Sequence, residues 1–365
     1  MKILAVPKST DKKYSFELFE LLRYYQNEIT AFGENSGISN IKIFSILKKL
    51  KEPFNFKNDN IPLKLDKILN DEKFDFIWNM GLNRESLHLL AQRADSRGIR
   101  FLQTISNDAL IFSENWTKTK QPFHVLDKLV KFYDSSIDVY LVQSKFIKNI
   151  LEQNGINQEK IIYIPAFIDS LKYSPCFKSE NYFLYQYHPE NQYGFDFIID
   201  TMKKIPQHKL IINIEKKDSY IKEIKKKNRL KNILFVENLS ETEKQNLFKM
   251  TKFTLIFSDT SPQEILESYA MGKPVLAVNS GSNEEYMVNT YSGLLFNIDV
   301  NDLSEKINYM MQNQAFCIEA GKFARSLAQN CFNKQNHYTT FFKAIHKIPK
   351  KKQLAPFNSK YLHIS

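Results

Sequence analysis

Short apolar runs alternate with longer amphipathic segments along most of the chain. The runs are rich in β-branched residues and lie at positions 3–6, 28–32, 74–78, 101–104, 139–143 and 160–164. The same rhythm restarts after Pro175, with apolar runs at 182–187, 209–214, 233–236, 253–257 and 275–278. Strands that alternate with helices predict βαβ units and therefore parallel sheets. The pattern predicts two α/β sheets, one after the other along the chain.

The segment from Pro165 to Glu180 separates these two halves. It contains two prolines and many polar residues, and its apolar positions follow no sustained period, which is typical of an interdomain linker. We therefore expect two doubly wound, Rossmann-like domains, residues 1–168 and 169–333, that face a cleft beside the linker. A basic tail is expected at residues 349–365.

Composition supports a folded protein in a reducing compartment. Of 365 residues, 43% are hydrophobic and 25% charged, a globular profile. The three cysteines, Cys176, Cys317 and Cys331, are too few and too scattered to suggest a disulfide framework or a zinc site. The apolar run at the N-terminus is too short for a signal peptide, and no stretch is long enough to span a membrane. These features favour the cytoplasm.

The basic character of the chain indicates an anionic partner. The net charge is +11, which favours contact with phosphates, nucleic acid or anionic lipid. No zinc-finger or aromatic-basic signature accompanies the lysines, so nucleic acid is not expected. Residues 43–51 read as a basic amphipathic helix. Such a helix suits either a peripheral position on an anionic membrane or ordinary packing on the first sheet.

The strand at 253–257 is followed by a well-specified helix. Ser261 and Glu264 have the spacing of a capping box, Pro262 suits the first helical position, and Gly272 can supply the left-handed stop. A helix that begins at the carboxyl end of a parallel strand presents unpaired N–H groups, which bind anions such as a diphosphate. Glu267 is expected on the helix face that looks into the cleft.

This helix carries a sequence motif that resembles the motif of a known enzyme family. Residues 267–275 read Glu-Ser-Tyr-Ala-Met-Gly-Lys-Pro-Val, and Asp259 lies eight positions before Glu267. The arrangement resembles the retaining, GT-B-fold glycosyltransferases of group 1, which use nucleotide-sugars. Weaker likenesses follow the family's order at 144–155, 162–169, 193–200, 279–285 and 292–296. The resemblance implies an N-terminal acceptor-side domain, a C-terminal nucleotide-sugar domain, and a helix near 334–348 that packs back on the first domain.

The resemblance also assigns roles to particular residues. Glu267 would accept hydrogen bonds from the nucleotide ribose, and Asp259 would hold donor-sugar hydroxyls. Gly281 and Ser282 would let the backbone approach the phosphates. The other positions assigned to the donor side are Tyr193, Thr260, Ser261 and Glu285, and those assigned to the acceptor side are Asn107 and Asp108.

Some positions depart from the family pattern. The family usually places an arginine and a lysine on the donor diphosphate, whereas His188 and Tyr193 stand at the matching positions here. Histidine carries a charge near neutral pH only in part, and tyrosine is a neutral donor, so stabilisation of the leaving diphosphate is expected to be weaker. His188 and Asp259 are the candidate catalytic residues. Asp259 is one methylene shorter than the usual glutamate.

Three functions remain open from the sequence. The first is transfer of a sugar from a nucleotide-sugar, as substrate, to a saccharide or lipid-linked acceptor, with no metal or other cofactor. Bacterial cell-surface polysaccharide or lipopolysaccharide synthesis is the setting that this interpretation suggests. The second is a catalytically inactive, glycosyltransferase-like partner protein, which the missing cations would explain. The third is a sugar epimerase on the same scaffold, which the Glu267 motif favours less.

Overall fold

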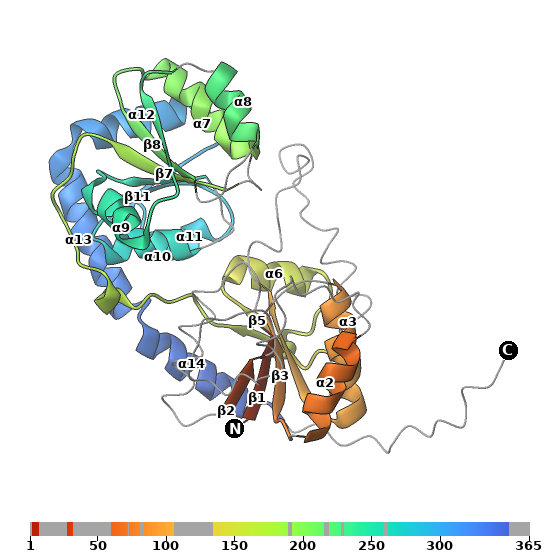
Figure 1. The fold of residues 1–365 in the computed structure, drawn as a ribbon. Helices are drawn as coiled ribbons and strands as arrows, with labels where there is room; N and C mark the ends of the chain where they lie inside the picture. The colour runs from red at the N-terminus through yellow and green to blue at the C-terminus, as the bar shows by residue number, and fades with distance from the viewer. Residues whose placement is uncertain are drawn as a thin grey trace.

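The computed structural model describes residues 2–6, 28–31, 60–71, 73–80, 84–105, 134–188, 192–214, 219–227, 230–257 and 262–349. These residues form two parallel six-stranded sheets with helices between successive strands (Figure 1). The predicted fold class, two Rossmann-like α/β units, is confirmed. The amphipathic segment at 43–51 and nearly all of the basic tail lie outside the described residues. None of the described helices is long and apolar enough to cross a membrane.

The first sheet has the strand order β2-β1-β3-β4-β5-β6. Its strands are β1 (Lys2–Val6), β2 (Glu28–Ala31), β3 (Phe76–Asn79), β4 (Arg100–Ile105), β5 (Val139–Val142) and β6 (Ile161–Tyr163). Helices α2 (Asn60–Asp71), α3 (Arg84–Arg97) and α6 (Lys145–Gln153) share one apolar core with this sheet. The strands are mostly apolar, since helices cover the sheet.

The second sheet has the order β12-β11-β10-β7-β8-β9. Its strands are β7 (Phe183–Tyr187), β8 (Leu210–Ile214), β9 (Ile233–Glu237), β10 (Thr254–Ile256), β11 (Val275–Val278) and β12 (Gly293–Phe296). Five of these match the apolar runs of the sequence. The edge strand β12 was not predicted, because Gly293 opens it and the run is only four residues long.

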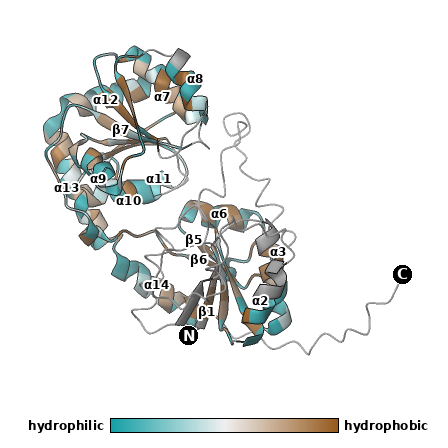
Figure 2. Ribbon diagram, in the orientation of Figure 1, coloured by the Kyte–Doolittle hydropathy of each residue, from teal (hydrophilic) through white to brown (hydrophobic). Residues whose placement is uncertain are grey.

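Helices cover both faces of the second sheet. One face packs against α7 (Gln192–Lys204), α8 (Ser219–Lys227) and α12 (Val300–Gln312). The other face packs against α9 (Glu241–Met250), α10 (Pro262–Ala270) and α13 (Gln314–Asn330), with the short α11 (Asn283–Tyr286) near its edge. Figure 2 shows the apolar strands lying between two-toned helices. The amphipathic pattern of the helices thus reflects a sheet buried on both sides.

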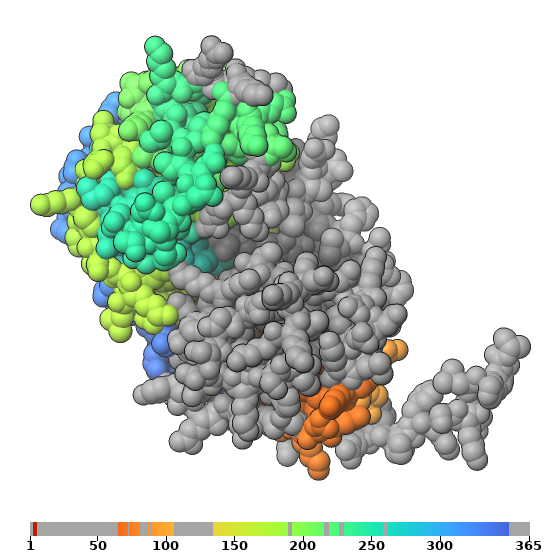
Figure 3. Space-filling view, in the orientation of Figure 1, coloured from red at the N-terminus to blue at the C-terminus, as the bar shows by residue number. Residues whose placement is uncertain are grey.

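The chain crosses between the two sheets twice, and the crossings run side by side. The first is the segment from Pro165 to Glu180, which holds only the short 3₁₀ helix η4 (Ser170–Lys172) and runs along one flank of the C-terminal unit (Figure 3). The second leads from α13 into α14 (Lys334–His346). At the crossing Ile168 N donates to Phe332 O over 2.8 Å.

Helix α14 ends the described chain on the first sheet rather than the second (Figure 1). Its Tyr338, Phe341 and Ile345 share a buried cluster with Trp78 of β3 and neighbouring strand residues. The rings of Trp78 and Phe341 stack at a centroid distance of 5.1 Å. The C-terminal segment therefore completes the apolar cover of the N-terminal unit.

Candidate active site

The order of the second sheet creates a switch point between β7 and β10. The chain runs from β7 outward to β9, then returns to β10 on the other side of β7 and runs outward to β12. In an open parallel sheet, the crevice at the carboxyl ends of two such strands is the usual ligand site. His188 follows β7 and α10 follows β10, so this topology brings the two predicted site segments together.

Helix α10 has the bounds that the sequence predicts. It begins at Pro262, ends at Ala270, and is stopped by Gly272, whose φ is 72°. Its Ile265, Leu266 and Tyr269 are buried in the core. Because these residues occupy the inner face, Glu264 and Glu267, three positions apart, remain partly exposed on the outer one. The capping partner Ser261 lies outside the described residues.

Glu267 lies where the linker passes the helix. The hydroxyl of the buried Tyr173 lies 3.4 Å from Glu267 Oε1. Tyr173 directly follows the 3₁₀ helix η4 of the linker, so a residue from the crossing segment supports the carboxylate. An ionised carboxylate is an acceptor-only group, which suits recognition of the two hydroxyls of a diol.

His188 contacts the carboxylate of Glu264 through Nε2. The sequence predicted Glu264 as a helix cap, and this contact with His188 was missed. It depends on β7 and β10 being neighbours, which strand order alone decides. The side chain of Glu264 is 16% exposed and that of His188 37% exposed. The pair therefore sits at the rim of the crevice, half shielded from water.

Tyr185 lies on β7 beneath this pair. Its hydroxyl is buried and finds no hydrogen-bond partner among the described residues. Burial, followed by the negative charge of Glu264, raises the pKa of Tyr185 well above its usual value. Tyr185 therefore stays neutral at any physiological pH.

Tyr193 lies in the first turn of α7 and is 50% exposed. Its ring meets Phe257 edge-on at a centroid distance of 6.3 Å. Phe257 follows β10, so Tyr193 is held near the same switch point as His188. Its position is compatible with the predicted donor-side role, and its hydroxyl is a neutral donor.

The two buried lysines of the second sheet lie away from this site. Lys252 precedes β10 and donates to Met311 O, while Lys273 precedes β11 and donates to Lys178 O over 2.8 Å. Burial lowers the pKa of Lys273 to about 8. Both lie before the amino ends of strands, so neither takes the place of the cations that the family pattern expects at the carboxyl ends.

Gly281 and Ser282 lie in the loop after β11, at the carboxyl edge of the sheet. Ser282 is buried and is the N-cap residue of α11, without a side-chain cap bond. Glu285, whose donor-side role stays a prediction, makes a contact that the sequence did not reveal. Its two carboxylate oxygens accept hydrogen bonds from Lys145 N and Phe146 N, at 2.7 Å each, at the start of α6 on the other sheet.

Five predicted site residues lie outside the part of the chain that the structure describes. They are Asn107, Asp108, Asp259, Thr260 and Ser261. Their roles on the acceptor and donor sides stay predictions.

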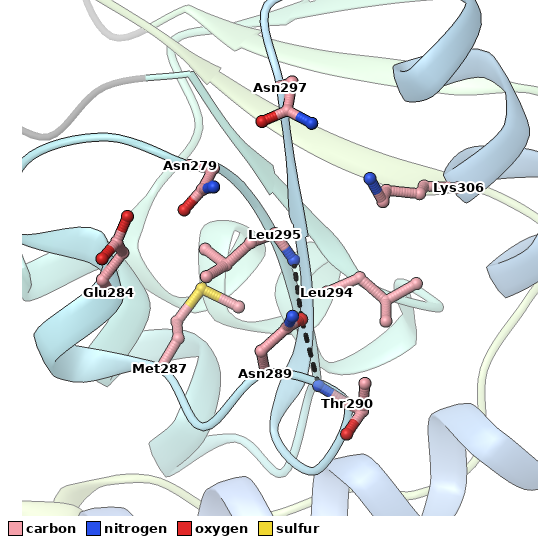
Figure 4. Close-up of a pocket in the computed structure, with 9 residues that line it drawn as sticks. All are labelled: Asn279, Glu284, Met287, Asn289, Thr290, Leu294, Leu295, Asn297 and Lys306. Carbon is pink, nitrogen blue, oxygen red and sulfur yellow. Dashed lines mark hydrogen bonds between the residues drawn. The ribbon is translucent and has the colours of Figure 1, made fainter.

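An open pocket of about 590 Å³ lies beside the loop after β11. Figure 4 shows polar side chains around it from the loop after β11, from α11, from both ends of β12 and from α12, with Leu294 and Leu295 of β12 among them. Asn289 Oδ1 accepts from Leu295 N and Thr290 N, both at 3.1 Å. These bonds satisfy outward N–H groups beside the sheet edge and so protect the edge strand from pairing.

Among the described residues, no three His, Cys, Asp or Glu side chains gather in a way that could hold a metal ion. The described chain therefore points to no particular metal-ligating set.

Comparison with known families gives a match for the C-terminal half. Residues 172–330 match the family described as glycosyl transferases group 1. This half resembles the group 1 glycosyl transferases. The match contains His188, α10 with Glu267, and the Gly281–Ser282 loop, so it covers the whole described part of the candidate site.

A curated relative supports the same family. An uncharacterized glycosyltransferase of Methanocaldococcus jannaschii is 28% identical over 187 residues, which cover 50% of this chain and 52% of that protein. The match therefore spans about half the length of the curated relative.

Solved structures of glycosyltransferases share the complete two-sheet architecture. Anabaena HepE, in complex with UDP and glucose, has a TM-score of 0.72 at 17% identity and covers 95% of this chain and 99% of its own. The lipopolysaccharide outer core galactosyltransferase WaaB in its apo form has a TM-score of 0.66 at 15% identity, with coverage of 95% and 99%. These likenesses show the GT-B fold over 95% of the chain in each comparison.

Proposed function

We propose that the chain transfers a sugar from a nucleotide-sugar to a saccharide or lipid-linked acceptor. The observation that carries the proposal is the position of Glu267. It lies in the segment that matches group 1 glycosyl transferases and on a helix at the topological switch point of the second sheet. That crevice is the general ligand site of such sheets.

Glu267 is the proposed ribose-binding residue. An ionised carboxylate only accepts hydrogen bonds and can receive two from neighbouring hydroxyls of a ribose. The Tyr173 hydroxyl, 3.4 Å from Oε1, restricts the side chain before the ligand arrives. A restricted side chain loses less conformational freedom on binding, which favours affinity.

His188 and the start of α10 are proposed to face the donor diphosphate. Departure of the nucleotide leaves negative charge on the diphosphate, and cations or helix N-terminal N–H groups stabilise it. Protonated His188 supplies a charged donor, and its contact with Glu264 fixes the orientation of the ring. Part of the positive charge is offset by Glu264, so we expect slower turnover than with a fixed arginine.

Three finer features belong to the same proposal. Gly281 and Ser282 bring backbone close to the donor, no metal takes part, and the sugar keeps its anomeric configuration, as the group 1 resemblance implies. The HepE complex with UDP and glucose supports a nucleotide-sugar donor, because that protein shares this fold across its length.

The proposed setting is the cytoplasmic side of bacterial surface polysaccharide or lipopolysaccharide synthesis. WaaB, which shares the fold, is a lipopolysaccharide outer core galactosyltransferase. The three cysteines of this chain are all free, which suits a reducing compartment. Contact with an anionic membrane surface remains part of the proposal through residues 43–51.

Nucleotide binding tests the proposal. Thermal unfolding is recorded with UDP, GDP, ADP, CMP and the corresponding nucleotide-sugars, each with and without EDTA. At a ligand concentration of about 100 times Kd, binding stabilises the native state by about 2.7 kcal/mol, which raises Tm by several degrees. We expect one nucleotide class to give this shift, and EDTA to leave it unchanged.

Two variants locate the site in that assay. Glu267→Gln keeps the shape of the side chain but removes its charge, and we expect Kd to rise about tenfold or more, because hydrogen bonds to a charged group contribute about 1.5–3 kcal/mol. Glu305→Gln is the matched control, since Glu305 is exposed on α12. The proposal fails if no nucleotide shifts the wild type, or if both variants bind as tightly as it does.

A further inference from the structure

Two neighbouring residues of the C-terminal unit bond to backbone of the N-terminal unit. Glu285 Oε2 and Oε1 accept from Lys145 N and Phe146 N, each over 2.7 Å. The hydroxyl of Tyr286 donates to Gln143 O over 2.6 Å and accepts from Ala166 N over 2.7 Å. Both residues belong to the short helix α11. Three of these four bonds cross between the two halves of the chain, and the fourth joins the C-terminal unit to Ala166 in the linker.

Glu285 completes the N-terminal cap of α6. Ser144 is the N-cap residue, and its hydroxyl accepts from Ile147 N over 3.1 Å. That bond leaves the N–H groups of Lys145 and Phe146 without a partner inside the helix. The carboxylate of Glu285 receives both, and its negative charge lies at the positive end of the helix dipole. A residue of one domain therefore satisfies the first turn of a helix in the other.

Tyr286, the residue after Glu285, also holds α11 to backbone groups near the start of α6. Its side chain is 1% exposed, so its hydroxyl is removed from competing water. The hydroxyl donates its hydrogen to Gln143 O, after β5, and its oxygen accepts from Ala166 N in the linker. The pair Glu285–Tyr286 is thus tied to a strand end, a helix start and the linker.

The tied helix directly follows the loop that approaches the donor. Residues 279–282 connect β11 with α11. Asn283 is the first residue of α11, and Val278 is the last residue of β11. The side chain Nδ2 of Asn283 donates to Val278 O over 3.0 Å, so the two ends of the loop are joined. The loop containing Gly281 and Ser282 therefore runs from the second sheet to a point that is fixed on the first.

We propose that Glu285 is a positioning residue that couples the approach of the two domains to the placement of the Gly281–Ser282 loop against the donor. Glu285 is proposed to act through the loop, since each of its carboxylate oxygens already accepts a hydrogen bond from the start of α6. The coupling rests on the proposed nucleotide-sugar function, whereas the interdomain cap itself does not.

Hydrogen exchange of the full-length chain tests the cap without any ligand. In Glu285→Ala the amides of Lys145 and Phe146 lose their acceptors, so we expect the peptide that spans the start of α6 to exchange more than tenfold faster. Glu284→Ala is the control, since Glu284 is the adjacent, exposed carboxylate of the same helix. Glu285→Gln keeps one acceptor oxygen and should restore part of the protection. Unchanged exchange in Glu285→Ala would overturn the cap.

Nucleotide titration tests the coupling. The nucleotide that stabilises the wild type is titrated into Glu285→Ala and Glu284→Ala, and we expect Kd to rise about tenfold in the first and to stay unchanged in the second. Faster exchange at α6 with an unchanged Kd would overturn the coupling. If no nucleotide binds the wild type, the proposed function and the coupling both fail, and the exchange experiment still decides the cap.

Discussion

At the residue scale, the buried His337 makes the stability of the fold depend on pH where the chain crosses between the two sheets. His337 lies at the start of α14, where the chain returns to the first sheet, and is 5% exposed. Its Nδ1 lies 2.6 Å from Pro165 O, and its ring packs on Phe167 at a centroid distance of 4.5 Å. Burial lowers the pKa of His337 to about 4, which the bond to Pro165 only partly offsets.

This shift predicts a stability that falls in mild acid. The unfolded chain takes up a proton near the ordinary histidine pKa of about 6.5, whereas the folded chain resists protonation until about pH 4. The free energy of unfolding is therefore unaffected by protonation of His337 above about pH 6.5. It falls as the pH drops toward 4, by up to about 3 kcal/mol, because only the unfolded chain binds the proton in this range. Denaturant unfolding between pH 7 and 4 measures it. His337→Gln should flatten the slope, and equal slopes for both proteins would contradict the burial argument.

Individual residues also mark the limit of sequence prediction. Glu267 was predicted on the outer face of its helix because the apolar spacing of Ile265, Leu266 and Tyr269 fixes the inner one. The contact of Glu264 with His188 was not predicted, since it needs the strand order of the second sheet. The contact of Glu285 with α6 was not predicted, because nothing in the sequence shows that α6 lies opposite it.

At the element scale, the packing of α13 on α10 depends on Gly321. A Cβ built at Gly321 would lie 2.2 Å from Gly272 O, which is part of the turn that ends α10. Backbone atoms cannot give way as a flexible side chain would, so the two helices must separate. The close approach therefore requires glycine at this position.

Gly321→Ala tests the close contact between α13 and the end of α10, because the contact decides whether the substitution raises or lowers the free energy of unfolding. On helix propensity alone the change should stabilise an α-helix by up to about 1 kcal/mol. The clash should reverse the sign and cost about 1–3 kcal/mol, in the range of overpacked cores. Urea unfolding gives the free energy directly. A stabilised variant would show that α13 and α10 are not in backbone contact.

The elements themselves were mostly predictable, and the reasons are local. All six strands of the first sheet and five strands of the second coincide with short apolar runs, because strands buried on both faces are mostly apolar. The edge strand β12 was missed, since it is short, opens with Gly293 and is only partly buried. Its pairing with β11 is a tertiary effect that the periodicity of so short a run does not reveal.

At the scale of the whole molecule, the two halves were predictable as separate sheets but not in their mutual contacts. The linker could be recognised by its prolines and lack of period. The contacts of Glu285 and Tyr286 with α6, Gln143 and Ala166 join residues more than a hundred positions apart. Such contacts depend on how the two domains pack against each other, so they leave no periodic signal in the sequence.

The central claim is that this scaffold transfers sugar from a nucleotide-sugar with Glu267 in the donor site. The most direct measurement is release of nucleoside diphosphate from the nucleotide-sugar that binds, with water or a simple saccharide as acceptor. We predict release by the wild type and by Glu305→Gln, and a rate at least tenfold lower for Glu267→Gln at limiting donor, because lost hydrogen bonds to the carboxylate weaken donor binding. No release by the wild type from any nucleotide-sugar, or equal release by Glu267→Gln, would contradict the claim.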